Sequence, residues 1–380
     1  MTVRVRATVL AATAAALSLS LAAPAFAAPT DRDHDATRDA IRAAVQIGVP
    51  GVTATARDSR GTWRATEGVG NLRTGAPRSA DDHYRIASIT KTFVATVVLQ
   101  LEAEGRLSLD DTVDKWLPGV VRGNGNDGRK ITLRQLLNHT SGIYDYTSDE
   151  EFERQIFLAE GFFQYRYDHR DPADLVGIAM THKPDFKPGT SWSYSNTNYV
   201  LAGMLIERVT GNPYGEEIED RIIEPLDLDE TSVPGDRVSV PKPSSRAYSK
   251  LSRLPTGPTY DVTRLNPTAA SAAGEMISDS DDLNRFTSAL LRGKLLPPQQ
   301  LKEMKTTISS PDFPGMRYGL GLIEYNLSCG VTVWGHSGGI HGSTSEAVST
   351  ADGKHSLALN FNGDWSGDSV AVITAEFCNK

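Results

Sequence analysis

The sequence predicts an α+β fold, an α/β sandwich in which an antiparallel sheet is flanked by helices and carries an inserted, mostly helical region. Strand-like segments occur near both ends of the chain, at residues 51–70 and 318–362. Between them, residues 106–289 are mostly helical segments broken by proline and glycine. Because a sheet must bury its apolar face, the segments from the two ends are expected to pair in one sheet. The sheet part is placed at about residues 29–105 and 290–380.

The first 27 residues are predicted to be a secretory signal peptide. Arg4 and Arg6 precede an apolar stretch that ends in "AFA" at residues 25–27, which is typical of a cleavage site. A membrane anchor is the alternative, but polar residues follow, and no other segment has the roughly 18 apolar residues that a span needs. Cleavage would leave residues 28–380 as one secreted domain without a membrane anchor.

The elements of the N-terminal part follow from local patterns. Residues 29–47 are predicted to form a helix after a polar leader, because apolar side chains recur along one side of it. The 51–70 segment alternates around a Ser-Arg-Gly turn and is predicted to be a β-hairpin. A helical pattern then runs from Thr90 to Gly105, a residue type that commonly ends helices.

The C-terminal part returns to strands. Residues 234–268 are rich in proline and polar residues, which predicts a long irregular surface stretch. Short alternating or apolar runs then predict strands in "YGLGLIEYN", "GVTVWGH", "TSEAVST" and "HSLALNFNG". The "ADGK" sequence at 351–354 is a hairpin turn signal, and residues 368–380 are predicted to form a closing helix.

Composition excludes several classes of function. The formal net charge is −8 at pH 7, and the signal contributes two arginines and no acidic residue. An acidic chain without basic clusters is a poor nucleic-acid binder. The eight histidines form no H-E-x-x-H pattern and the two cysteines no C-x-x-C pattern, so no metal site is predicted. We expect no cofactor and a monomer.

Both cysteines, Cys329 and Cys378, belong to the part of the chain that would be exported. An oxidising destination favours a disulfide between them. Closing a loop of this length would contribute roughly 4 kcal/mol in the chain-entropy model. Two free buried thiols are the alternative.

Ser88 and Lys91 form an S-x-x-K pattern at the start of the helix predicted from Thr90. The free N–H groups and the dipole at a helix start favour a developing negative charge. The spacing places Lys91 on the same helix face one turn later, and burial there would lower its pKa and make it a base. A second S-x-x-K pattern, Ser239 with Lys242, has prolines beside the lysine and no helix after it.

Tyr194 and Asn196 stand in "WSYSNTNYVLAG", which forms the second candidate motif. A tyrosine hydroxyl that shares protons with a neighbouring lysine can relay them to a leaving group. Asn196 offers an amide that would orient the lysine and the substrate carbonyl. An ordinary turn before a helix is the alternative.

His336, Ser337 and Gly338 form the third candidate motif, in "VTVWGHSGGIHG". A strand here ends in a cationic or polar residue, a hydroxyl and a glycine. The edge of this strand could lie along an extended substrate. Because Gly338 has no side chain, the substrate could approach the strand closely there. A glycine-rich turn with a solvent-facing histidine is the alternative.

Together these motifs resemble those of the serine penicillin-recognising enzymes, which include DD-peptidases, class C β-lactamases and related esterases. That family has S-x-x-K, Y-x-N and K-T-G or H-T-G in this order, and here "SITK", "YSN" and "HSG" follow in the same order. The similarity extends through "TLRQLLNHTSGIYDYT" and "YGLGL". The histidine variant and the two cysteines look most like the secreted, soluble D-alanyl-D-alanine carboxypeptidases.

The resemblance implies a mechanism. Ser88 would attack the carbonyl of the penultimate D-alanine of cell-wall-type peptides, and Lys91, Tyr194 or the pair would take its proton. The backbone N–H groups of Ser88 and Gly339 would hold the oxyanion. Penicillins would acylate the same serine. A class C β-lactamase, a D-amino-acid amidase or esterase, and a non-catalytic penicillin-binding protein are the alternatives.

Two departures from the family pattern concern the half of the site that would hold the substrate carboxylate. A hydroxyl residue often follows the third motif in relatives, whereas Gly339 stands here. Close relatives carry an arginine after "GLGL", whereas this chain continues with Ile323 and Glu324. Arg317 is suggested, by its place in the sequence alone, as a substitute for the arginine that would hold the substrate carboxylate.

Two other motif matches are weaker. "GHSGG" at 335–339 fits the nucleophile elbow of α/β-hydrolases, with Ser337 as nucleophile and His355 as base, but no helix pattern follows it. "GNGNDG" at 123–128 fits a dinucleotide-binding pattern, but no strand pattern precedes it, and a loop is expected.

Overall fold

The computed structural model describes residues 34–311 and 315–378, so the predicted signal peptide, residues 1–27, lies outside the described residues. Its central feature is a sheet of nine strands, in the order β10-β11-β12-β13-β14-β15-β1-β2-β3, with antiparallel pairing throughout. The strands are β1 (Gly51–Asp58), β2 (Gly61–Asn71), β3 (Ala76–Pro77), β10 (Ile308–Ser309), β11 (Met316–Tyr318), β12 (Ile323–Asn326), β13 (Thr332–Ile340), β14 (Ser343–Thr350) and β15 (Ser356–Phe361).

The two ends of the chain meet where β1 pairs with β15, with Ala54 opposite Leu359. The sheet therefore joins N- and C-terminal segments, as predicted, and the α+β class is confirmed. The predicted hairpin is β1–β2, and the turn at 351–354 links β14 to β15.

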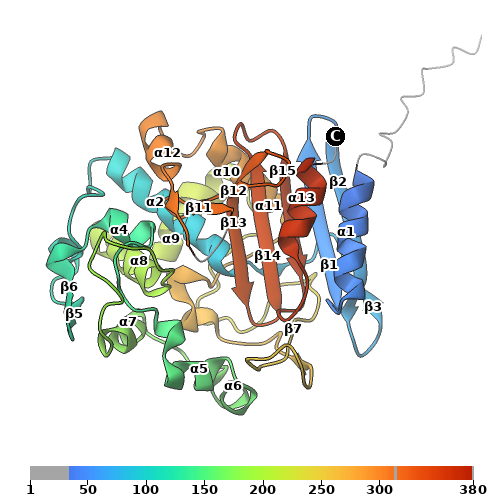
Figure 1. The fold of residues 1–380 in the computed structure, drawn as a ribbon, viewed down its shortest axis with the longest axis horizontal. Helices are drawn as coiled ribbons and strands as arrows, with labels where there is room; N and C mark the ends of the chain where they lie inside the picture. The colour runs from blue at the N-terminus through green and yellow to red at the C-terminus, as the bar shows by residue number, and fades with distance from the viewer. Residues whose placement is uncertain (1–33, 312–314, 379–380) are drawn as a thin grey trace, which may run out of the picture.

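Helices cover both faces of this sheet (Figure 1). The first helix, α1 (Asp35–Gln46), and the last, α13 (Ser369–Cys378), pack together on one face. On the other face lies α11 (Ser280–Leu291), which contacts β1, β14 and β15. All of β15 is buried, because alternate residues face two apolar clusters: Leu359 packs toward α1 and α13, and Ala358 toward α11.

The position of α11 corrects one predicted boundary. The sequence pattern assigned residues 280–289 to the inserted helical part, whereas this helix lies on the sheet. Phe286 of α11 stacks on Phe93 with ring centroids 3.6 Å apart, so α11 also joins the sheet to the helix that carries the S-x-x-K motif.

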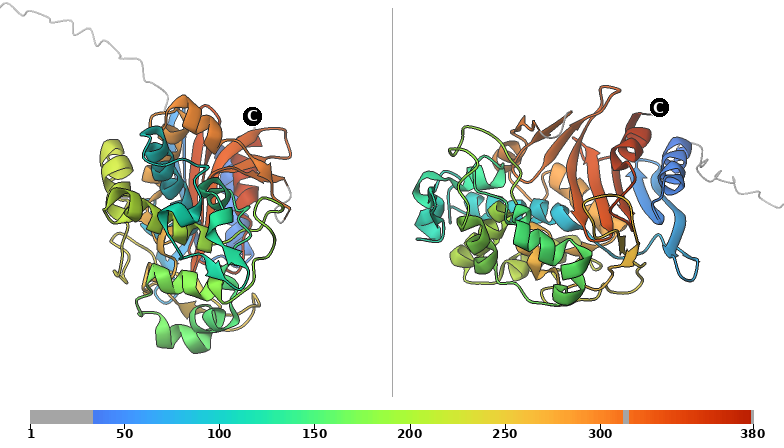
Figure 2. Two further views of the ribbon diagram at one scale, coloured as in Figure 1. Left: turned by 90° about the vertical axis from the view of Figure 1, so that its left-hand side faces the viewer. Right: turned by 60° about the horizontal axis from the view of Figure 1, so that its bottom comes forward.

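The helical part lies beside the sheet, at the end away from α1 and the β1–β2 hairpin (Figures 1 and 2). Its helices are short except for α8, and three two-stranded pairs accompany them. The helices are α3 (Val113–Trp116), α4 (Leu133–Leu137), α5 (Glu150–Ile156), α6 (Ala159–Tyr165), α7 (Pro172–Met180), α8 (Thr197–Thr210), α9 (Tyr214–Ile218) and α10 (Glu224–Leu226), with α12 (Pro298–Met304) near the sheet. The pairs are β4–β9 (Tyr84–Arg85, Ile277–Ser278), β5–β6 (Arg122–Gly123, Asn126–Asp127) and β7–β8 (Tyr248–Ser249, Tyr260–Asp261).

Helix α2 (Thr90–Ala103) runs through the interior between the two parts. Its residues are buried nearly all round, which is the expected result of an apolar pattern on every face. The helix ends before Gly105, which has a φ of +70°, so this glycine serves the predicted terminating role. Within the described residues, no helix is long and apolar enough to span a membrane.

A disulfide joins Cys329 to Cys378 and ties α13 to the loop between β12 and β13. We predict that replacing both cysteines by serine lowers the free energy of unfolding by about 4 kcal/mol, because the bond closes a loop of 49 residues in the unfolded chain. Urea denaturation of the double variant and of the oxidised protein measures this. A loss below about 1 kcal/mol would show that the bond does not contribute through loop closure.

Candidate active site

Ser88 lies in a single turn of 3-10 helix, Ala87–Ile89, and α2 begins two residues later at Thr90. The nucleophile candidate therefore precedes the α-helix proper rather than opening it. The preceding residue, Ala87, has a φ of +47°, a conformation that costs a non-glycine residue about 1 kcal/mol or more. Such backbone strain occurs preferentially at functional sites.

Lys91 lies directly beneath Ser88. Its Nζ is 2.9 Å from Ser88 Oγ, 2.8 Å from Asn196 Oδ1 and 2.7 Å from the carbonyl oxygen of Ala273. The residue is 0 % exposed, and burial lowers its pKa to about 7, with the charge of Asp145 opposing the shift. A neutral amine has two N–H donors for the two carbonyl oxygens, and its lone pair then faces the Ser88 hydroxyl. Lys91 is thus arranged to accept the Ser88 proton.

Asn196 stands just before α8, and Asp145 fixes the orientation of its amide. Asn196 Nδ2 donates to Asp145 Oδ2 at 3.0 Å, and the Asn196 backbone N–H donates to Asp145 Oδ1 at 3.2 Å. Because a carboxylate only accepts, the amide oxygen must point to Lys91. Asp145 is a site residue that sequence reasoning missed; it lies in a quoted segment but has no partner within any short motif.

Tyr194 completes the constellation from the same segment as Asn196. Its phenol lies near enough to Ser88 for that side chain to lower the phenol pKa slightly, against the larger effect of burial, and its ring centroid is 4.9 Å from Lys91 Nζ. Burial raises the pKa of the phenol, so the hydroxyl keeps its proton, while burial moves the pKa of Lys91 the opposite way. The geometry therefore suits Lys91 as the base and Tyr194 as the relay toward a leaving group.

His139 is a second residue that sequence reasoning missed. It is fully buried, with a pKa held well below its usual value by burial and by Lys91, and its ring centroid is 4.3 Å from that of Tyr194. His139 Nδ1 accepts the backbone N–H of Ser195 at 3.2 Å. This neutral imidazole packs behind Tyr194 and helps to hold its ring. The signal for it was weak, since one histidine in an apolar segment has no distinctive pattern.

His336 was expected to be a cationic or polar residue, with a solvent-facing histidine as the alternative, and in the structure it is buried and neutral. It is 2 % exposed, and burial with the nearby Lys91 lowers its pKa to about 3. Its Nδ1 lies 2.6 Å from the Ser337 carbonyl oxygen, which can only accept, so Nε2 accepts the Tyr318 hydroxyl at 2.8 Å. His336 is thus a neutral, buried residue beside the Ser88 site.

Gly338 also has a role other than the one predicted. A side chain there would place its first carbon 2.1 Å from the backbone oxygen of Ile86, so the missing side chain admits the protein's own backbone next to Ser88, not a substrate. Gly339 has open space at the corresponding position.

The outer half of β13 has one free edge. Pairing with β12 ends at Gly335, whereas pairing with β14 continues to Ile340. Residues 337–340 therefore pair on one side only, and this segment packs against the turn that carries Ser88. Ser88 and Gly339, whose backbone N–H groups are predicted to form the oxyanion hole, line the same two cavities.

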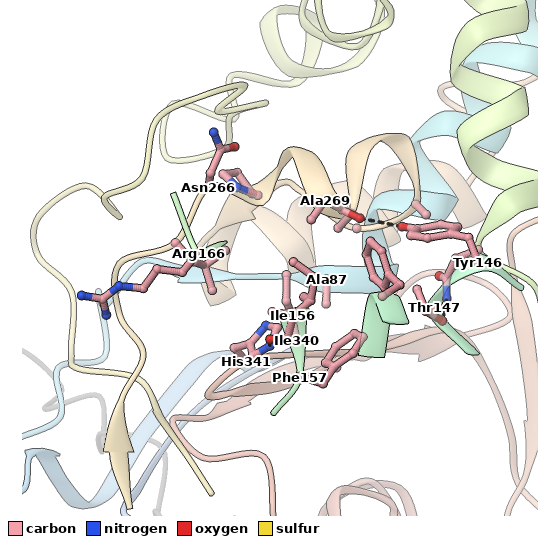
Figure 3. A pocket seen from close by; sticks show the side chains of 18 of the residues that line it. Ala87, Tyr146, Thr147, Ile156, Phe157, Arg166, Asn266, Ala269, Ile340 and His341 are labelled. Atoms are coloured by element: carbon pink, nitrogen blue, oxygen red, sulfur yellow. Dashed lines mark hydrogen bonds between the residues drawn. The ribbon is translucent and has the colours of Figure 1, made fainter. Parts of the chain in front are cut away.

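The first of these cavities, here called the aromatic cavity, has a volume of about 280 Å³. Ser88 and Asn196 lie on its wall, and the remainder is mostly apolar: Tyr146, Phe152, Ile156, Phe157, Phe162 and Ile340. Figure 3 shows Ile156, Phe157, Ile340 and His341 gathered beside Ala87, whereas Arg166 extends away from them. The Tyr146 hydroxyl donates to the Ala269 carbonyl oxygen at 2.7 Å.

His341 supports this wall from behind. It is buried, with its pKa lowered to about 4, and its Nε2 lies 2.8 Å from the Ile156 carbonyl oxygen. Its ring stacks on Phe157 at 5.0 Å and contacts Phe162. The aromatic cavity is therefore largely pre-formed.

The second cavity, here called the strand-side cavity, has a volume of about 200 Å³ and lies along β11, β12 and β13. It shares Ser88, Tyr194 and Gly339 with the aromatic cavity and is further lined by Ser310, Met316, Arg317, Tyr318, Ile323, His336 and Ser337. Ser88 thus stands where the two cavities meet.

Arg317, suggested from the sequence as a carboxylate partner, does line the strand-side cavity. Its Nε and Nη2 each donate to Thr307 at 2.9 Å, and Nε lies 3.5 Å from Glu324 Oε2. Glu324 therefore offsets part of the positive charge of Arg317.

The weaker motif matches are not assembled into sites. Ser239 and Lys242 are exposed, and no helix follows them. Ser337 lies within β13 rather than on a strand-to-helix turn, and His355 bonds to Glu376 of α13. Residues 123–127 belong to the small β5–β6 hairpin, and Gly128 begins a turn of 3-10 helix. Within residues 34–311 and 315–378, no group of three or more His, Cys, Asp or Glu side chains is arranged to hold a metal ion.

A serine activated by a buried lysine and a tyrosine, at the junction of a helical part and an antiparallel sheet, defines a serine hydrolase with a β-lactamase fold. The family model described as Beta-lactamase matches residues 37–373, and the chain belongs to that family.

Among solved structures, this chain is similar to a D-stereospecific amidohydrolase from Streptomyces sp., with 61% identity, a TM-score of 0.87, and coverage of 91% of this chain and 99% of the other. It is also similar to a D-amino acid amidase from Ochrobactrum anthropi, at 27% identity and a TM-score of 0.79, covering 92% and 100%. Penicillin-binding protein 4* of Bacillus subtilis is 27% identical over 74% of this chain, and the match spans 61% of that protein's own length.

Proposed function

We propose that this protein hydrolyses amides of D-configured amino acids through an acyl-enzyme on Ser88. The observation that carries the proposal is the apolar, largely aromatic cavity that opens directly beside the Ser88–Lys91 pair. A cavity of this kind suits the side chain of an apolar or aromatic aminoacyl group.

The chemistry follows from the contacts of Ser88. Its oxygen attacks the amide carbonyl while Lys91 takes the hydroxyl proton, and the backbone N–H groups of Ser88 and Gly339 hold the oxyanion. Tyr194 passes a proton to the departing amine and regains one from Lys91, and the C–N bond breaks. Water then attacks the ester carbonyl while the neutral Lys91 takes its proton, and that proton passes to Ser88 Oγ as the ester C–O bond breaks. Hydrolysis of the ester releases the amino acid.

An amidase is better supported than the D-alanyl-D-alanine carboxypeptidase favoured by the sequence resemblance. A carboxypeptidase must hold a free carboxylate in the leaving group, and burying that charge without a partner is costly. In the strand-side cavity the described lining offers a neutral His336 and an Arg317 for which a substrate carboxylate would compete with Glu324. The names of the two amidohydrolase relatives also support the D configuration and the amide bond.

The test compares substrates on the purified protein. D-Phenylalanine amide is expected to be hydrolysed with a kcat/KM at least about 100-fold above that of L-phenylalanine amide, because the wrong enantiomer cannot place both its carbonyl and its side chain. A D-alanyl-D-alanine peptide and nitrocefin, assayed alongside, are expected to be poorer substrates. Faster release of terminal D-alanine than of ammonia would favour the carboxypeptidase instead.

A further inference from the structure

The strand-side cavity is larger than the release of ammonia requires. A water-sized molecule needs about 10–15 Å³ by the same kind of measure, whereas this cavity has about 200 Å³. The cavity adjoins Ser88 and Tyr194 on the side of the third motif, away from Asn196 and the aromatic cavity. If the acyl side chain fills the aromatic cavity, the leaving group faces the strand-side cavity.

The described lining of the strand-side cavity is mixed in polarity, and its one charged side chain, Arg317, is paired with Glu324. Met316, Tyr318 and Ile323 supply apolar surface. Lining of this kind accepts an apolar group with a neutral polar end and disfavours a free carboxylate.

One polar group at this cavity has no partner. Ser310 follows the edge strand β10, is 5 % exposed, and its Oγ is buried with no hydrogen-bond partner among the described residues. Because the Oγ itself has almost no accessible surface, a turn about the Cα–Cβ bond is needed to bring it into the cavity. Buried hydroxyls are ordinarily hydrogen-bonded, so an orphaned hydroxyl at a cavity wall indicates a group that would satisfy it.

Resting on the proposed function, we infer that the strand-side cavity binds the leaving group as a whole residue whose own carbonyl is an amide. The Ser310 hydroxyl turns toward the cavity and donates a hydrogen bond to that neutral carbonyl oxygen. The substrate class is then a D-aminoacyl peptide, or another D-aminoacyl amine with an uncharged end, cleaved after its first residue.

The experiment compares three substrates: D-phenylalanine amide, D-phenylalanyl-L-leucine amide and the same dipeptide with a free carboxylate. For the unmodified protein, we expect kcat/KM for the dipeptide amide to exceed that of each of the other two by about tenfold or more. Equal or faster cleavage of the free acid would mean that a cation serves this cavity, and would overturn the inference.

Ser310→Ala separates the hydrogen bond from the shape of the cavity. We expect it to lower the ratio of kcat/KM for the dipeptide amide over D-phenylalanine amide by about fivefold, the effect of one neutral hydrogen bond. Ser309→Ala, at the exposed neighbouring position of β10, is the matched control and is expected to keep the ratio. An unchanged ratio in Ser310→Ala would overturn the role of Ser310. No turnover of any of the three substrates by the unmodified protein would instead overturn the proposed function itself.

Discussion

Replacing Ser88 by alanine is expected to lower kcat/KM for D-phenylalanine amide by about 10⁴-fold or more. Loss of a nucleophile removes the covalent route altogether, and only binding and oxyanion stabilisation remain. At 25 °C this factor corresponds to about 5.5 kcal/mol of transition-state stabilisation. Steady-state kinetics with ammonia detection measures it, with a thermal melt to show that the variant is folded.

Ser337→Ala is the matched comparison, because Ser337 is the nucleophile under the α/β-hydrolase alternative. It lines the strand-side cavity, so some loss of rate is expected, but it should still form the acyl-enzyme. If Ser337→Ala were inactive and Ser88→Ala retained most activity, the assignment of the nucleophile would be wrong.

Replacing Lys91 by methionine is expected to lower kcat/KM by about 10³-fold, because a base of this kind typically contributes 10²–10⁴-fold. Methionine has a similar length and tolerates burial, so the core position of α2 should remain filled. The amine that accepts the Ser88 proton is lost, and Ser88, Asn196 and Ala273 lose their shared partner.

The pH profile of the unmodified protein tests the same role without a substitution. Burial lowers the pKa of Lys91 to about 7, and only the neutral amine can accept a proton. The kcat/KM should therefore rise about tenfold per pH unit below pH 7 and level off above it, so that the value at pH 5 is about 100-fold below the plateau. A profile that stays flat down to pH 5 would contradict Lys91 as the base.

The chemistry of the site was predictable where the side chains themselves carry it. Ser88, Lys91, Tyr194 and Asn196 lie in short motifs whose spacing reflects a helix turn or a single loop, and the structure brings these four together. Similarly, an apolar pattern on all faces predicted that α2 is buried.

The remaining contacts depend on segments that are far apart in the sequence. Asp145 contacts Asn196, and the Ala273 carbonyl oxygen contacts Lys91, each from a separate part of the chain. No local sequence pattern predicts such long-range contacts. The sequence left open whether His336 is cationic, neutral or solvent-facing, because a residue type does not reveal burial, and burial decides its charge.

The place of α11 was mispredicted for a related reason. An amphipathic helix needs an apolar partner, but its pattern does not tell whether that partner is a sheet or another helix. Phe286 of α11 packs against Phe93 of α2, while neighbouring turns of the same helix cover β14 and β15.

The central claim is that Ser88 becomes covalently acylated by a D-aminoacyl group. It is tested most directly by stopping the reaction with the ethyl ester of D-phenylalanine in acid within milliseconds, digesting the protein, and mapping the modified peptide by mass spectrometry. We predict a mass increase equal to one phenylalanyl residue on Ser88 that disappears as substrate is exhausted. Turnover with every peptide unmodified, or with the acyl group on another residue, would contradict it.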